Sequence, residues 1–181
     1  MTESMEHILM GCMQGTTSLI WRLASEAWDH ETYQWPRISF GIALGCGNLT
    51  AKTHRPQDEE PEEPQGIPVG RRGVTRLLQI LVSEATHLIW VLRCERVIQE
   101  KVHSSHKAEA RWYKAINRRL TEDKITATKI KRQKHYTELV KATWENLLKK
   151  NSDPPHNWIQ NSGVLVGRRA QQAVPINDRV L

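Results

Sequence analysis

The sequence contains no run of apolar residues that approaches the roughly 20 needed to cross a membrane, and its mean hydropathy is −0.57. Its first twelve residues, MTESMEHILMGC, have neither a cationic flank nor a long apolar stretch, so they do not resemble a secretory signal. Only three cysteines occur in 181 residues, without the spacing of a disulfide framework. We therefore expect an intracellular protein, nuclear or cytoplasmic, that is not secreted and has no membrane contact.

Aromatic residues are also scarce, at 6% of the chain, and they comprise seven tryptophans, three tyrosines and a single phenylalanine. The apolar share is 39%, which is below the roughly 45–50% of a typical globular domain. A chain of this length has room for one modest domain and little more. We therefore expect the tryptophans to supply much of a small core.

Charge is divided unevenly along the chain, although the net value is only +6. Residues 1–65 hold 4 basic and 10 acidic side chains, whereas residues 101–150 hold 14 basic and 5 acidic ones. A basic stretch of this kind attracts polyanions, because each Lys or Arg placed on a phosphate releases a condensed counterion. A solvated helical face is the alternative explanation.

Apolar residues recur at helical spacing in four stretches, the longest running from Val74 to Lys101. The others cover about 17–30, 105–130 and 133–149. A short apolar run at 38–44 is either a strand or one buried turn of helix. The sequence thus predicts an all-α fold, a small helical bundle with a long central helix, a disordered acidic loop and extended termini.

This predicted bundle divides into five segments. They are an N-terminal tail (1–16), a helix with a glycine turn (17–47), a Pro-rich acidic loop (48–73), the helical core (74–150) and an extended or disordered tail (151–181). The loop includes the sequence DEEPEEP, which has no apolar side chain to bury and repels itself. We therefore predict that this loop is disordered.

Two small groups of residues are candidate ligand sites. His7 and Cys12 have the H-x4-C spacing of the second half of a zinc knuckle, but a tetrahedral site needs two further ligands. Arg71 and Arg72 precede a predicted helix start, where free backbone N–H groups favour an anion. A solvated helix entry is the alternative explanation for the two arginines.

The third group lies in the basic C-terminal half. Arg111, Lys114 and Arg118 are spaced by three and four residues, so they share a helical face that phosphates can approach. The predicted nucleic-acid-binding residues are Arg111, Lys114, Arg118, Arg119, Lys131, Arg132 and Lys134. Carboxylates in the predicted helices are scattered, so we predict no catalytic residues and do not expect an enzyme.

Several stretches resemble the C-terminal region of non-LTR retrotransposon polyproteins, particularly fungal ones. TESMEHIL followed by Cys12 is similar to the end of the zinc-binding region that follows the reverse transcriptase in that family. Segments similar to the region downstream are LIWRLA at 19–24, WP at 35–36, LGCG at 44–47, LIWVLRCERVI at 88–98, WI at 158–159 and GVLVG at 163–167. Cys94 stands where the family has Asn, and the first zinc cysteine pair is missing.

The resemblance implies a detached piece of a retroelement polyprotein, without polymerase or ribonuclease H modules. It implies no cofactor of its own, because zinc would need ligands missing from this chain. We therefore expect a non-catalytic helical module that binds RNA or DNA without sequence specificity through a basic helical face. The alternatives are a helical protein–protein interaction module and a decayed element with no selected activity; ribonuclease H or reverse transcriptase enters only by association with the parent polyprotein.

Overall fold

The computed structural model describes residues 4–11, 15–28, 30–53, 68–130, 134–149, 154–161 and 163–166. Its elements are η1 (His7–Gly11, π-helical), α1 (Thr16–Trp28), α2 (Phe40–Leu44), η2 (Cys46–Asn48, a 3₁₀ turn), α3 (Val69–Ile98), α4 (Ser105–Lys129) and α5 (Lys134–Lys149). These residues contain no β-strand, and an isolated β-bridge joins Tyr33 to Thr53. The prediction of an all-α fold is confirmed.

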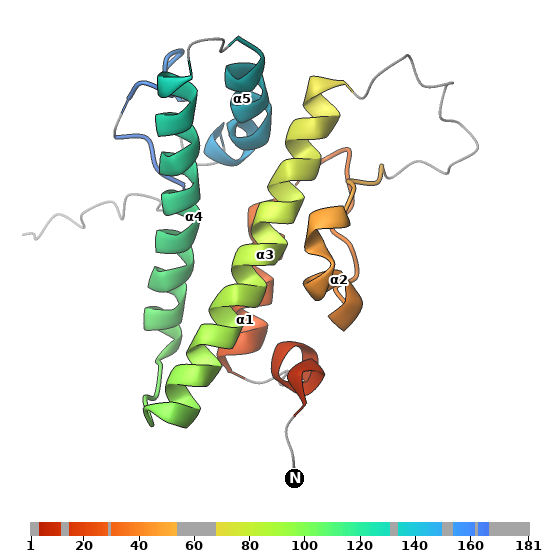
Figure 1. Ribbon diagram of the computed structural model, residues 1–181, viewed down its shortest axis with the longest axis vertical. Helices are drawn as coiled ribbons and strands as arrows, with labels where there is room; N and C mark the ends of the chain where they lie inside the picture. The colour runs from red at the N-terminus through yellow and green to blue at the C-terminus, as the bar shows by residue number, and fades with distance from the viewer. Residues whose placement is uncertain are drawn as a thin grey trace, which may run out of the picture.

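The central element is α3, and η1, α1, α2, η2, α4 and α5 all pack against it. Its apolar residues recur every three or four positions from Val74 to Leu92 and are buried, as their periodicity predicts. Figure 1 shows α3 crossing the molecule, with α2 on one side, α4 on the other and α5 between the upper ends of α3 and α4. The prediction of a long central helix is therefore confirmed.

By length and composition alone, α3 is long and apolar enough to cross a membrane. This differs from the expectation that no stretch of the sequence is sufficiently apolar. The core helix of a globular bundle passes the same test, and 56% of the most apolar part of α3 is buried inside the protein. Packing against the other helices therefore accounts for its composition.

The start of α3 differs from the prediction. The helix begins at Val69, directly after Pro68, and not at Val74, so that Gly73 lies inside it. A Cβ atom on Gly73 would stand only 2.5 Å from the carbonyl carbon of Ala142 in α5. Glycine weakens a helix locally, but here it allows two helix backbones to approach closely, which sequence periodicity does not register.

The N-terminal segment is packed onto the bundle. Leu9 of η1 is only 1% exposed, and the indole nitrogen Nε1 of Trp21 donates a hydrogen bond to its carbonyl oxygen at 2.9 Å. Of α1, the side chains of Ile20, Leu23, Ala24 and Trp28 are buried. The predicted tail 1–16 thus contributes a core residue, and the helix predicted over 17–30 is confirmed.

The apolar run at 38–44 forms the short helix α2, so the helical alternative holds. The Ser39 hydroxyl caps it by accepting a hydrogen bond from the backbone N–H of Ile42 at 3.3 Å. Gln79 of α3 then fixes the segment that follows, since its side-chain nitrogen donates to the carbonyls of Gly47 and Leu49 at 3.0 and 2.9 Å. Most of the predicted acidic loop, residues 54–67, lies outside the described residues.

The C-terminal helices form as predicted, with α4 continuous over its whole length. Four tryptophans are core residues: Trp28, Trp112, Trp144 and Trp158. The last of these corrects the prediction of an extended or disordered tail for the described residues 154–161, whereas most of the predicted tail, from 167 to 181, lies outside the described residues. Trp158 and Ile159 are 3% and 7% exposed, because a turn over 156–160 folds them onto the bundle.

Candidate nucleic-acid interface

The solvent-facing side of α4 carries a row of basic residues, the α4 stripe, which consists of Lys107, Arg111, Lys114, Arg118 and Lys129. Successive members are four, three, four and eleven residues apart, so they project from one face of the helix. The opposite face is fixed in the core by Trp112, Ile116 and Leu120. At 1.5 Å per residue the stripe extends for about 33 Å.

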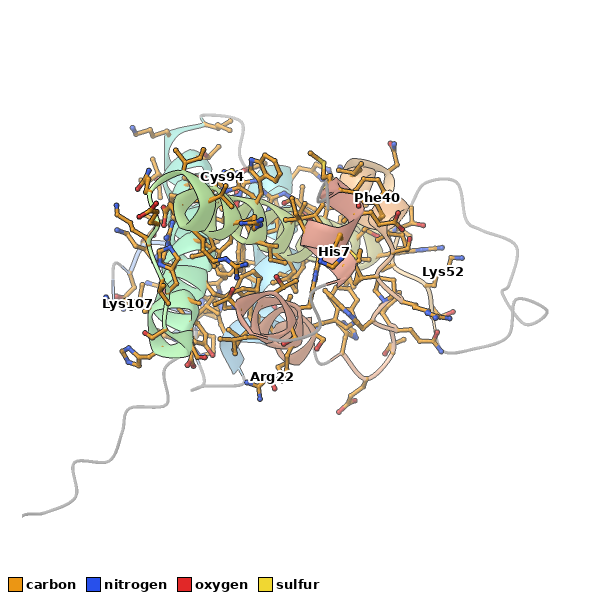
Figure 2. All side chains as sticks on the ribbon, turned by 90° about the horizontal axis from the view of Figure 1, so that it is seen from below. His7, Arg22, Phe40, Lys52, Cys94 and Lys107 are labelled. Carbon is orange, nitrogen blue, oxygen red and sulfur yellow. The ribbon has the colours of Figure 1, made fainter. Side chains whose placement is uncertain are left out.

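Three members of the α4 stripe are free of carboxylates. Within the part of the chain that the structure describes, Lys107, Lys114 and Lys129 are exposed and have no ion-pair partner. Figure 2 shows Lys107 at the opposite side of the molecule from Lys52, a basic residue in the segment before the predicted acidic loop. Three exposed ammonium groups therefore lie along α4 and are available to an anion, while others, such as that of Lys52, lie elsewhere.

Arg111, by contrast, forms an ion pair with a residue of α3. Its two terminal nitrogens donate to Glu95 at 2.6 and 3.0 Å, which makes the pair bidentate. His103 Nε2 also lies 2.9 Å from Glu95 Oε2. The hydrogen bonds from Arg111 hold the pKa of Glu95 below its ordinary value. Arg111 thus clamps the α3–α4 connection and contributes less positive charge to the stripe than its position suggested.

Arg118 and Arg119 are joined to a buried carboxylate. Glu84 of α3 is 6% exposed, and its oxygens lie 2.8 Å from Arg119 Nε and 3.4 Å from Arg118 Nη2. Glu122 adds contacts at 3.9 Å to Arg118 and 3.6 Å to Arg119. The side chain of Arg118 remains 58% exposed, so it still faces solvent on the stripe, whereas Arg119 turns towards α3.

The other predicted contacts are divided. Lys134 is exposed in the first turn of α5, off the α4 stripe, and Lys131 and Arg132 lie outside the described residues. The structure therefore brings Arg111, Lys114 and Arg118 together on one face, as predicted, and adds Lys107 and Lys129. Both additions could have been found from helical spacing, since they stand four residues before Arg111 and eleven after Arg118.

The predicted anion site at Arg71 and Arg72 lies within the first turns of α3, and not before the helix as predicted. The backbone N–H of Arg72 donates to the carbonyl of Pro68 at 3.0 Å. Its guanidinium nitrogen Nη1 lies 3.0 Å from His135 Nε2 of α5. Arg72 is therefore a contact between two helices, and binding of an anion at this helix start stays a prediction.

Sequence analysis did not foresee a polar centre between α3, α4 and α5. Asp123 is 7% exposed. Its carboxylate accepts hydrogen bonds from both terminal nitrogens of Arg76 at 2.6 Å. It also accepts one from Trp144 Nε1 at 2.7 Å and one from the Tyr136 hydroxyl at 3.4 Å. Burial is the largest single influence on the pKa of Arg76 and lowers it, but the hydrogen bonds to Asp123 together with the charges of Asp123 and Tyr136 outweigh burial, so the pKa is raised. Burial raises the pKa of Tyr136, and the charge of Asp123 adds to the effect.

A cavity of about 240 Å³ borders this polar centre and is lined by Arg76, Gln79, Arg119, Glu122 and Asp123, among others. Its two carboxylates are both ion-paired with arginines, whereas metal-dependent hydrolysis requires several that converge on metal ions. The described part of the chain contains no group of three His, Cys, Asp or Glu residues that could hold a metal ion. The expectations of no enzyme activity and no cofactor stay predictions.

The half zinc motif has only one member in the described residues. His7 is exposed on η1, and its backbone N–H donates to the Ser4 hydroxyl at 3.1 Å. Cys12 lies outside the described residues. The structure therefore adds no ligand to the two that the sequence suggested.

No protein-family model matches the chain, and no curated protein or solved structure is significantly similar to it. The resemblance to retrotransposon polyproteins consequently rests on the sequence segments quoted above.

Proposed function

We propose that the protein is a non-catalytic helical module that binds RNA or DNA without sequence specificity, with the α4 stripe against the phosphates. One observation carries the proposal: Lys107, Lys114 and Lys129 stand exposed on one helical face and, among the described residues, have no carboxylate partner. The resemblance to retrotransposon polyproteins supports the same proposal, and we infer from it that the module descends from one.

The chemistry of the stripe favours phosphates over bases. Lysine is a flexible point charge, which suits contact with a phosphate. Stacking on bases needs exposed aromatic rings, but Trp112, the tryptophan of α4, is 1% exposed. Binding should therefore be almost entirely electrostatic.

An electrostatic interface predicts a particular response to salt. Four contacts, from Lys107, Lys114, Arg118 and Lys129, give a slope of about −3.6 in log affinity against log salt on duplex DNA. Between 50 and 300 mM salt, the affinity should therefore fall roughly 600-fold. Fluorescence anisotropy with a labelled duplex measures this slope, and an affinity that does not change with salt contradicts the proposal.

Charge reversal then locates the interface. Lys114→Glu/Lys129→Glu should weaken duplex binding at least tenfold and reduce the salt slope by about 2, because two phosphate contacts are removed. The matched control is Arg37→Glu/Lys52→Glu, which makes the same charge change at two exposed positions away from α4. If both variants lose affinity equally, net charge and not the α4 stripe determines binding.

A second candidate is a protein-interaction module, favoured by an apolar depression of about 280 Å³ lined by Met5, Leu9, Leu44 and Trp90, among others. Met5, Leu44 and Trp90 are 44%, 56% and 39% exposed, and exposed apolar clusters mark docking surfaces. In this case the charges of α4 only keep the bundle soluble, so charge reversal leaves partner binding intact and Trp90→Ser abolishes it.

A further inference from the structure

The end of α3 and the start of its connection to α4, residues 97–102, expose an unusual concentration of aliphatic side chains. Val97, Ile98 and Val102 are 56%, 77% and 86% exposed. We call this segment the hairpin tip; it lies where α3 and α4 meet at the lower end of the molecule in Figure 1. Single exposed apolar residues are ordinary, but three within six residues at one end of a molecule form a patch.

The hairpin tip is a structured turn. The backbone N–H groups of Gln99 and Lys101 both donate to the carbonyl of Glu95, at 3.0 and 3.3 Å, and Glu100 adopts the left-handed conformation with φ 54°. Ser104 caps the start of α4 by accepting the N–H of Lys107 at 3.3 Å. The aliphatic side chains are therefore held outward by a hydrogen-bonded frame.

Basic residues surround the hairpin tip. Arg96, Lys101 and Lys107 are exposed and, within the described ranges, have no ion-pair partner. Of the nearby acids, Glu95 is occupied by Arg111 and His103, which leaves Glu100 as the exposed negative charge of the turn. The tip thus consists of an aliphatic end with a predominantly cationic collar.

We infer that the hairpin tip docks on an anionic lipid bilayer. The aliphatic side chains would enter the boundary between headgroups and acyl chains, and the collar would contact the headgroup phosphates. A nucleic acid complements the collar but leaves the aliphatic side chains in water. The inference replaces the expectation of no membrane contact and does not depend on nucleic-acid binding.

The expected strength is modest, since neither element suffices alone. One basic residue near an anionic surface increases partitioning about fivefold. Phosphatidylcholine vesicles and vesicles with about a third phosphatidylserine should therefore differ clearly in a sedimentation assay with the full chain. We expect retention on the anionic vesicles and weak or no retention on the neutral ones.

Two variants separate the aliphatic end from the collar. Ile98→Ser/Val102→Ser should reduce retention on anionic vesicles more than tenfold, and Lys101→Glu should reduce it at least fivefold. The matched control, Ile125→Ser/Leu165→Ser, removes two aliphatic side chains that are 47% and 58% exposed elsewhere and should leave retention unchanged. All these side chains are exposed, so each variant should keep the near-ultraviolet circular dichroism of the parent.

Three outcomes would overturn the inference. The first is that the parent chain is not retained on anionic vesicles, and the second is that the tip variant is retained as well as the parent. The third is that the parent is a dimer which Ile98→Ser/Val102→Ser converts to a monomer, because the tip would then bind a second copy of the chain. Duplex binding by the tip variant should match that of the parent. The vesicle result therefore stands or fails separately from the proposed nucleic-acid function.

Discussion

Arg76 of α3 and Asp123 of α4 form a bidentate ion pair, with both nitrogen–oxygen distances at 2.6 Å. Trp144 of α5 donates to the same carboxylate at 2.7 Å, so one buried side chain joins three helices. The Arg76 side chain is 28% exposed and the Asp123 side chain is 9% exposed. The pair therefore lies at the edge of the core, beside the 240 Å³ cavity.

Breaking this pair from one side should be costly. Asp123→Ala leaves the Arg76 charge half-buried without its partner and removes the acceptor of Trp144, so we expect about 3 kcal/mol of destabilisation in urea unfolding. Arg76→Met should cost a similar amount, because Asp123 keeps its charge in the core. The double variant Arg76→Met/Asp123→Ala should be more stable than the sum of the two single losses implies, since no unpaired charge remains. Additive losses in the double variant would contradict this account.

Sequence periodicity predicts the bundle well because the signal is local. Leu77, Leu81, Leu88 and Leu92 repeat at helical spacing, and so they mark α3 without knowledge of its neighbours. The close approach of α3 and α5 at Gly73 has no such local signal, because Ala142, which lies against Gly73, is far from it in sequence. The buried Trp158 was missed for a related reason, since a single apolar pair between polar residues has no period.

The candidate interface was predictable only in part. Helical spacing places Arg111, Lys114 and Arg118 on one face, and the structure agrees. Whether each charge is free depends on acids of another helix: Glu84 is 34 residues from Arg118 in sequence, and only the crossing of α3 and α4 brings them together. Asp123 did carry a signal, because it lies three residues after Leu120 on the buried face of α4.

The close approach of α3 and α5 makes a prediction about Gly73. Gly73→Ala would place a methyl group 2.5 Å from the backbone of Ala142, so the helices must separate, and we expect about 2 kcal/mol of destabilisation by overpacking. Gly70→Ala is the matched control, because a Cβ there meets nothing within 4 Å. It should be neutral or stabilising by up to about 1 kcal/mol. Thermal unfolding compares the two, and equal behaviour would show that the helices do not meet as described.

The docking of the C-terminal segment makes a third prediction. The amide of Asn117 on α4 donates to the carbonyl of Val166 at 3.1 Å and accepts its N–H at 2.6 Å. Asn117→Asp keeps the acceptor but loses the donor and adds a charge, so we expect about 1 kcal/mol of destabilisation. Hydrogen exchange at the N–H of Val166 should accelerate in Asn117→Leu. Unchanged protection in this variant would mean that the segment is held by its apolar contacts alone.

The clamp between Glu95 and Arg111 makes a prediction about pH. Because Arg111 lowers the folded-state pKa of Glu95 from 4.5, the pair contributes stability above that pH and loses it as the pH falls through the folded pKa. We expect the parent chain to lose about 1 kcal/mol more than Arg111→Met on acidification from neutral pH to below the folded pKa, the difference arising below about 4.5. Urea titrations of both proteins across this range measure the difference. Parallel pH profiles would show that Arg111 does not stabilise the ionised form of Glu95.

The left-handed residue at the hairpin tip makes the last prediction. Glu100 has φ 54°, a conformation that costs a side chain of this type about 1 kcal/mol and that Asn adopts more readily. Glu100→Asn should therefore stabilise the protein by up to about 1 kcal/mol in thermal unfolding. It also removes the exposed negative charge of the tip, so retention on anionic vesicles should rise several-fold. Glu100→Gln is the control that removes the charge and keeps the side-chain length and the strain, so it should strengthen vesicle retention without the gain in stability.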